Sequence, residues 1–364
     1  TEDSKPSKLP RRISEGPPKF KWRGDPEETF SDWKIEIGLI GAEEDTTTVS
    51  VYHVHKGDLA FGARKSDYFA KLFRNAGQFR ESQSNTSRIL LHMIASDEFP
   101  RLLDYLYGER PLQITTETAT ALHYLGEYFE VSQLREDVEQ FCKEDIALEN
   151  VDTYYQHSTI FQSTTVLGAV ADWLGRNIKK VPLTSSIVQN SDLTLWVEVS
   201  KTSHVKSTPC SWSKLVAALG SQHTETIDRA TFQALTDPSV MRRVDQTVAL
   251  ELCDLEDRLG DSDNNAEGKP SDLSSLQSRC ATHLTYFDNW RALPSLDQDA
   301  LGLLRARKTP FLVDLLMKAL QGAKSNVESL QTELGESHTL TQELHSKLSS
   351  TEGKLLQARR ELKR

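Results

Sequence analysis

The feature that most constrains the fold is a heptad repeat through the last fifty residues. Apolar residues occupy seven of the eight positions spaced strictly seven apart from Val313 to Leu362, with Thr341 as the exception. Five of the seven positions that lie three residues further along are apolar as well. A hydrophobic period of 3.5 residues predicts a long α-helix that winds around a partner helix as a left-handed coiled coil.

This coiled coil is expected to span residues 311–364, with its large apolar a and d side chains as the core. These are Leu316, Leu320, Val327, Leu330, Leu334, Leu344, Leu348, Leu355 and Leu362. In a parallel pair the flanking positions place Glu333 against His338 and Lys347 against Glu352, but also Lys354 against Arg359. The charge pattern therefore permits a parallel homodimer and leaves the helix orientation open.

The N-terminal third has a different pattern, which predicts a small sheet followed by helices. Apolar and polar residues alternate over 33–39, and the β-branched segment 48–55 follows a polar turn, so the two form a predicted hairpin. A third strand is expected over 89–93. Apolar residues at three- and four-residue spacing predict helices over 66–74, 99–107, 119–128 and 131–142. The fold class over residues 31–145 is thus α+β.

These motifs resemble the BTB/POZ family. Ser31-Asp32-Trp33 stands at the family's entry strand, the segment from Tyr52 to Phe73 is similar to its second strand and first helices, and Phe99–Gly108 (FPRLLDYLYG) is similar to its central helix. Gly57 and Asp58 depart from the bulkier residues usual before the following leucine. The resemblance implies a homodimer that pairs through the entry strand, with Asp32 and Trp33 in the contact.

The resemblance also implies a partner. Cullin-binding members carry a hydrophobic-x-Glu triplet shortly after the helix ending near Arg74, and Phe79-Arg80-Glu81 fits this pattern. An ordinary polar loop with one anchoring Phe is the alternative. The implied function is an adaptor that recruits an unknown protein substrate to a cullin-based ubiquitin ligase. The other interpretation is a self-associating scaffold or transcription-linked interaction protein without ubiquitin transfer.

The remaining segments are assigned from composition and periodicity. Residues 1–30, rich in proline and basic residues, are expected to be a flexible tail, and the polar stretch 260–271 a linker. Residues 146–259 are predicted to be mainly helical and resemble, more weakly, the BACK extension that follows many BTB domains. Within them, 193–199 (LTLWVEV) alternates as a strand does. A helical segment is expected over 272–310.

Composition excludes several classes of partner. A net charge of −10 argues against nucleic acid as the main partner. The sequence contains no run of 18 apolar residues, so no membrane partner is expected. Four widely spaced cysteines without a CxxC pair favour a reducing compartment. We therefore expect a cytoplasmic location, with the nucleus as an alternative; because the first residue is Thr1, an upstream targeting segment remains open.

Catalytic and metal-binding patterns are weak throughout. The sequence contains no GxGxxG, GxxxxGK[ST], GxSxG or HExxH motif. His53 and His55 lie on one face of a predicted strand, yet a zinc site needs three or four ligands. We therefore expect no enzyme activity, no cofactor and no metal, and we expect both histidines to be structural.

Overall fold

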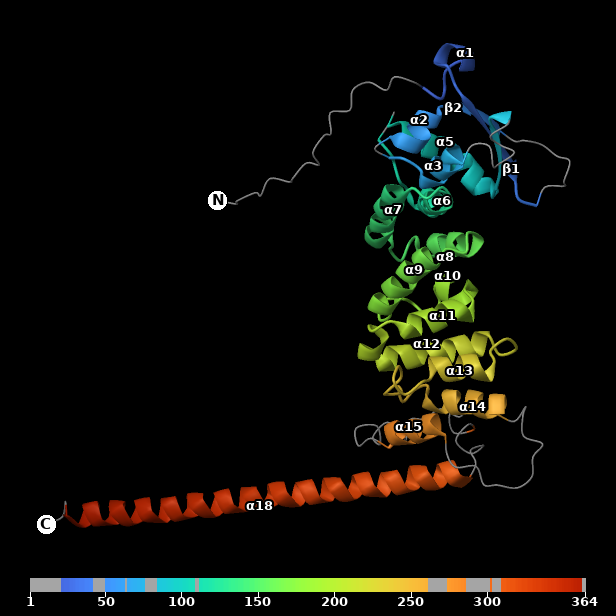
Figure 1. The fold of residues 1–364 in the computed structure, drawn as a ribbon. Coiled ribbons are helices and arrows are strands. Elements are labelled where there is room, and N and C mark those ends of the chain that lie inside the picture. The colour runs from blue at the N-terminus through green and yellow to red at the C-terminus, as the bar shows by residue number, and fades with distance from the viewer. Residues whose placement is uncertain are drawn as a thin grey trace. The chain divides into compact units, whose positions relative to one another are not determined.

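The computed structural model describes residues 21–41, 50–62, 64–75, 84–108, 111–260, 274–285, 302 and 309–361 (Figure 1). The chain divides into two compact units, one up to Leu174 and one from Gly175. The expected boundary lay at residues 145/146. The described part of the first unit therefore extends beyond the predicted domain to include one further helix and most of a second.

The first unit combines a three-stranded sheet with helices. In chain order its elements are α1 (Pro26–Thr29), β1 (Trp33–Leu39), β2 (Ser50–Val54), α2 (Lys56–Phe61), α3 (Asp67–Arg74), β3 (Thr86–Leu91), α5 (Met93–Tyr107), α6 (Thr116–Tyr128), α7 (Ser132–Asp145), α8 (Val151–Ile160) and α9 (Thr164–Asn177), which contains the division between units. The prediction of a small sheet with packed helices is confirmed.

The sheet has the strand order β2-β1-β3. β1 pairs antiparallel with β2, which confirms the hairpin, and parallel with β3. The alternation predicted from the sequence places Ile35 and Ile37 on the buried face, where both are fully inaccessible. The third strand begins earlier than expected and ends at Leu91, because Met93 already starts helix α5. Glycine at position 108 ends that helix in the left-handed conformation, with φ of 66°.

Stacked aromatic rings fill the core between sheet and helices. The ring of Phe69 on α3 stacks on Phe129, which follows α6, at 5.3 Å between centroids. Phe99 on α5 contacts the same ring at 5.5 Å. All three side chains are fully buried. Residues far apart in sequence thus share one core, as expected for a domain with its own hydrophobic centre.

Residues 21–30 differ from the flexible tail that was expected. They contain α1, whose N-terminus is capped by Asp25, and the Trp22 side chain is only 9% exposed. Trp22 contacts Tyr52 of β2 edge-on at 5.7 Å. The prediction of a flexible tail failed for these residues. It was based on their proline and basic content and did not consider that the Trp22 indole could pack against the domain.

The second unit is helical. Its elements are α10 (Ser186–Asn190), α11 (Leu193–Lys201), the short 3₁₀ helix η1 (Val205–Ser207), α12 (Pro209–Gln222), α13 (Arg229–Leu235), α14 (Ala249–Gly260), α15 (Ser275–Leu284) and α18 (Thr309–Glu361). The strand-like alternation over 193–199 is a misleading pattern, because the segment forms α11. Its buried residues Leu195, Trp196 and Val199 follow helical spacing and form one stripe. The predicted linker 260–271 lies outside the described residues except for Gly260, the last residue of α14.

Candidate interaction site

The entry strand carries the two residues that were expected to contact a second copy. Asp32 is exposed, and its carboxylate accepts a hydrogen bond at 2.8 Å from the backbone N–H of Lys56, the first residue of α2. Trp33 is only 4% exposed, and its indole donates a hydrogen bond to Ser87 on β3 at 3.1 Å. The Trp33 indole therefore belongs to the core of its own unit, and the place of the entry strand in a dimer contact stays a prediction.

His55 makes three hydrogen bonds to two groups. Its Nδ1 lies 2.9 Å from the Tyr107 hydroxyl and its Nε2 lies 2.6 Å from the carbonyl oxygen of Thr29, while its backbone N–H donates to the same Tyr107 hydroxyl. Both ring nitrogens therefore have partners within the domain. Within the described ranges, no group of three or more His, Cys, Asp and Glu side chains is arranged to hold a metal ion.

A second set of polar residues joins the N-terminal segment to α5. The carboxylate of Asp104 accepts a hydrogen bond from the Trp22 indole at 2.9 Å and pairs with the Arg23 guanidinium at 2.8 Å. The same guanidinium lies 4.1 Å from the centre of the Trp22 ring. We call Trp22, Arg23 and Asp104 the N-terminal anchor. Sequence reasoning missed it, and the only local signal was a tryptophan within a proline-rich basic stretch.

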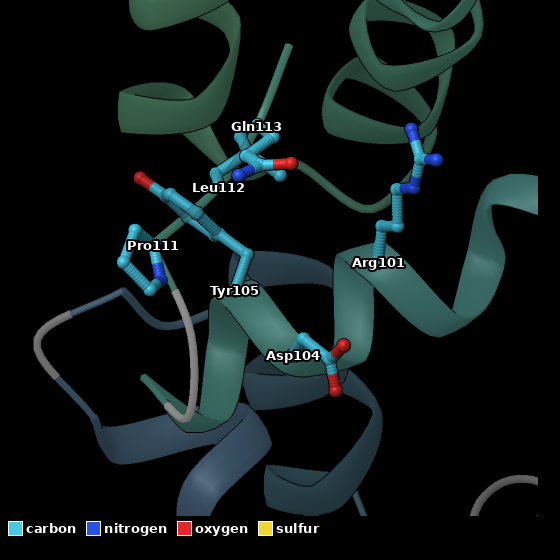
Figure 2. A pocket seen from close by; sticks show the side chains of 6 residues that line it. All are labelled: Arg101, Asp104, Tyr105, Pro111, Leu112 and Gln113. Carbon is cyan, nitrogen blue, oxygen red and sulfur yellow. The ribbon is translucent and has the colours of Figure 1, made fainter.

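A pocket of about 330 Å³ lies beside this anchor, where α5 is followed by the segment 111–113. Figure 2 shows Asp104 and Tyr105 pointing in different directions from neighbouring positions of α5. Burial, together with the nearby Asp137 carboxylate, raises the pKa of Tyr105 to about 12. The phenol is therefore neutral at physiological pH, and Asp104 is already paired with Arg23. This arrangement suits structural contacts better than proton transfer.

The expected cullin-type contact, Phe79-Arg80-Glu81, lies outside the described residues. The elements on both sides of it are placed: α3 ends at Arg74 and β3 begins at Thr86. The contact of this triplet with a cullin thus stays a prediction. In the chain the triplet follows α3, the second helix of the domain.

Helix α18 carries the predicted coiled-coil positions. Eight of the expected core residues are exposed, from 53% for Val327 to 72% for Leu334. The eight are Leu316, Leu320, Val327, Leu330, Leu334, Leu344, Leu348 and Leu355; Leu362 lies outside the described residues. Figure 1 shows α18 as one uninterrupted helix. Contiguous exposed apolar surface of this kind marks an interaction site.

The first turns of α18 use a different face to pack within the chain. Phe311 and Ala319 are buried, and the Lys318 ammonium donates hydrogen bonds to the Ser278 carbonyl and hydroxyl oxygens on α15, at 2.7 and 2.8 Å. These residues lie off the a and d positions. The helix therefore has one face that attaches it to its own unit and another that carries the exposed heptad residues.

The two faces meet in an apolar groove of about 410 Å³. Its lining includes the a and d residues Leu316, Leu320, Ala323, Val327 and Leu330, together with Thr285, the residue that follows α15. A groove bordered by heptad positions is suited to an apolar helix face, the mode in which helices commonly dock. No helix in the described parts of the chain is long and apolar enough to cross a membrane.

Comparison with known proteins bears on the first unit. No curated protein matches the chain. The family model for the BTB/POZ domain matches residues 45–146. This match covers β2, both helices that follow it, β3 and helices α5 to α7. The segment 45–146 of this chain is therefore a BTB/POZ domain.

Proposed function

We propose that this protein is a homodimeric interaction adaptor that recruits protein substrates to a cullin-based ubiquitin ligase and carries out no catalysis itself. BTB/POZ domains generally mediate self-association and binding to other proteins. The observation that carries the proposal is the combination of this domain with a helix whose heptad residues are exposed along its length. One chain thus offers two surfaces for partners.

Self-association is supported by the chemistry of the exposed stripe. Leucine and valine at a and d positions stabilise a structure only when a second helix covers them. Each Å² of apolar area that is removed from water contributes about 25 cal/mol. A second copy of the chain supplies an identical stripe and forms an isologous pair, which is the commonest oligomer symmetry. We assign the helices of residues 146–259, α8 to α14, to a BACK-like region, and either this region or α18 would bind the substrate.

The cullin contact rests on the position of Phe79-Arg80-Glu81 between α3 and β3 of the BTB/POZ domain. If Phe79 inserts into a cullin pocket, Phe79→Ala should abolish capture of a cullin scaffold, because truncating an interface anchor costs about 2 kcal/mol or more. Glu81→Ala should weaken capture less. Leu148→Ala, at an exposed apolar residue elsewhere in the same unit, is the matched control.

Cullin capture and melting temperature should both be measured for the parent chain and for Phe79→Ala. The adaptor proposal predicts that Phe79→Ala loses the cullin and keeps the melting temperature of the parent chain. A variant that melts early points to Phe79 as a buried residue, since such truncations cost about 3–5 kcal/mol of stability. A parent chain that captures no cullin favours the alternative, a self-associating scaffold built on the BTB/POZ domain and α18. The proposed location is the cytoplasm or the nucleus.

A further inference from the structure

The heptad residues of α18 contain information on how two copies pair. We propose that two α18 helices associate antiparallel, with residue 339 of each helix at the two-fold axis. This inference rests on the homodimer proposed above and specifies its geometry. It commits the exposed stripe and the groove beside α15 to the α18 helix of a second copy.

The core layers favour this register. In an antiparallel pair each a residue faces a d residue of the other helix, and centring on residue 339 brings the two polar core positions, Ser337 and Thr341, against each other. The other layers pair large with small or apolar with apolar side chains. They are Leu320 with Ala358, Ala323 with Leu355, Val327 with Thr351, Leu330 with Leu348, and Leu334 with Leu344.

A parallel pair makes a poorer core from the same residues. Each position then faces its own copy, so Ala323, Ser337, Thr351 and Ala358 form four thin or polar d layers. Cores pack best when large and small side chains alternate across the interface and fill the space evenly. The antiparallel arrangement provides this alternation.

The flanking charges agree. Antiparallel coiled coils bring g positions beside g and e positions beside e. Centring on residue 339 sets Glu333 against Lys347 and Lys324 against Glu352, and two-fold symmetry repeats each pair. All four side chains are exposed in the single chain. A parallel pair also brings Lys347 beside Glu352, but it sets Lys354 against Arg359 and leaves Lys324 without an acidic partner at these flanking positions.

Neighbouring registers lose part of this match, although in one of them Glu333 still faces a lysine, Lys354. Sliding one helix by one heptad in either direction breaks the contact between Lys324 and Glu352. In one direction Lys324 then faces Arg359, and in the other it faces His345. Like charges across an interface disfavour a pairing, so charge selects one register among those that the apolar pattern allows.

Leu340 supplies an independent observation. It occupies a g position, which is normally polar, yet it is 60% exposed in the single chain. In the proposed register the g positions at 340 of the two helices face each other across the two-fold axis. The apolar side chain is then covered by its own copy, whereas a parallel pair would place it beside His345.

The groove beside α15 fits the same geometry. Its lining residues Leu320, Ala323, Val327 and Leu330 would receive Ala358, Leu355, Thr351 and Leu348 of the other copy, respectively. The C-terminal part of each α18 thus fills the groove at the N-terminal part of the other. Each groove is completed by the second chain.

Spin-label distances in the full chain test the orientation. Single cysteines replace Ser325, Thr339 or Ser346, three exposed positions on the outer face of the helix, in a background in which the exposed Cys210 is replaced by Ser. The other three cysteines are buried. At about 1.5 Å per residue, the two labels should be displaced along the helix axis by roughly 42 Å at position 325, by roughly 21 Å at 346, and by almost nothing at 339.

The outcomes separate this inference from the homodimer itself. Distances that increase with separation from residue 339 support the antiparallel pair. A dimer by light scattering with nearly equal short distances at all three positions overturns the antiparallel pair and leaves the homodimer standing. A chain that stays monomeric contradicts both. A dimer with a long or broad distance at position 339 shows that the helices do not pair there, and also overturns the inference.

Exchanging the charges at positions 333 and 347 provides the matched control. The distance distribution of the label at position 325 is the readout. K347E opposes two carboxylates across the antiparallel interface and should reduce the fraction at the long distance. E333K combined with K347E restores opposite charges in that register and should recover this fraction. In a parallel pair the double variant would instead place a carboxylate at position 347 beside Glu352, so failure to recover contradicts the proposed register.

Discussion

The first unit and helix α18 use the same apolar residue types in opposite ways. In the first unit, Leu102 and Leu106 lie one turn apart on α5 and are both buried within one chain. In α18, Leu334 and Leu355 are 72% and 70% exposed although they lie at equally regular helical spacing. Periodicity therefore shows which face of a helix is apolar, and the surrounding chain decides whether that face is already covered.

The largest expected effect separates the two regions by stability. Phe129→Ala should lower the free energy of unfolding of the first unit by about 3–5 kcal/mol, because a fully buried aromatic ring is replaced by a cavity. Leu334→Ala should leave that transition unchanged. Chemical denaturation followed by tryptophan fluorescence checks both, and equal losses would break the contrast between the regions.

The second prediction addresses association. Replacing Leu334 and Leu348 by Asp places unpaired carboxylates in the proposed core, so the association constant should fall at least about 100-fold. Helicity of α18 should fall in parallel, because an isolated helix depends on its packed face. Analytical ultracentrifugation and circular dichroism measure the two. Asp at Thr332 and Ser346, on the outer face, is the control, and similar losses there would contradict the heptad register.

The third prediction concerns the N-terminal anchor. Asp104→Ala removes the carboxylate that accepts a hydrogen bond from the Trp22 indole and pairs with the Arg23 guanidinium, and it should cost roughly 1–3 kcal/mol of stability in the first unit. Asp104→Asn should cost less, since an amide oxygen still accepts from the indole. Hydrogen exchange of residues 21–30 should accelerate in both variants. Unchanged exchange would show that these residues are held by other contacts.

The smallest effect is a pH dependence in the second unit. Burial raises the pKa of the Glu256 carboxyl, although Ser274 donates a hydrogen bond to it. The folded state therefore holds this proton more tightly than the unfolded chain does. The stability gained from this tighter proton binding is fully present below the ordinary carboxyl pKa. It is lost as pH rises through the raised pKa of Glu256.

Glu256→Gln removes the cost of ionising a buried carboxyl. The variant should melt higher than the parent chain at pH 8, and the difference should shrink towards pH 4. Glu225→Gln, at an exposed position in the same unit, should show no such trend. A difference in melting temperature between Glu256→Gln and the parent chain that grows on acidification would contradict a raised pKa of Glu256.

How far the sequence predicts the structure differs between the two regions. The hairpin and the helices of the BTB/POZ domain follow from alternation and helical spacing, because each element buries one face. The strand-like alternation over 193–199 did not decide between strand and helix; the segment forms α11, because its buried residues Leu195, Trp196 and Val199 lie on one face of a helix. Trp22 packing and the contact of Lys318 with α15 depend on distant residues, which no local pattern reveals.

The central claim is that the exposed stripe of α18 serves a second copy of the chain. Light scattering of the full chain over a dilution series through micromolar concentrations tests it most directly. We expect a mass near twice 41.0 kDa that persists at the micromolar end of the series, and a lower mass at the same concentrations when Leu334 and Leu348 are both replaced by Asp; an equally stable dimer in that variant would also contradict the claim. A mass of 41.0 kDa throughout the series would contradict it.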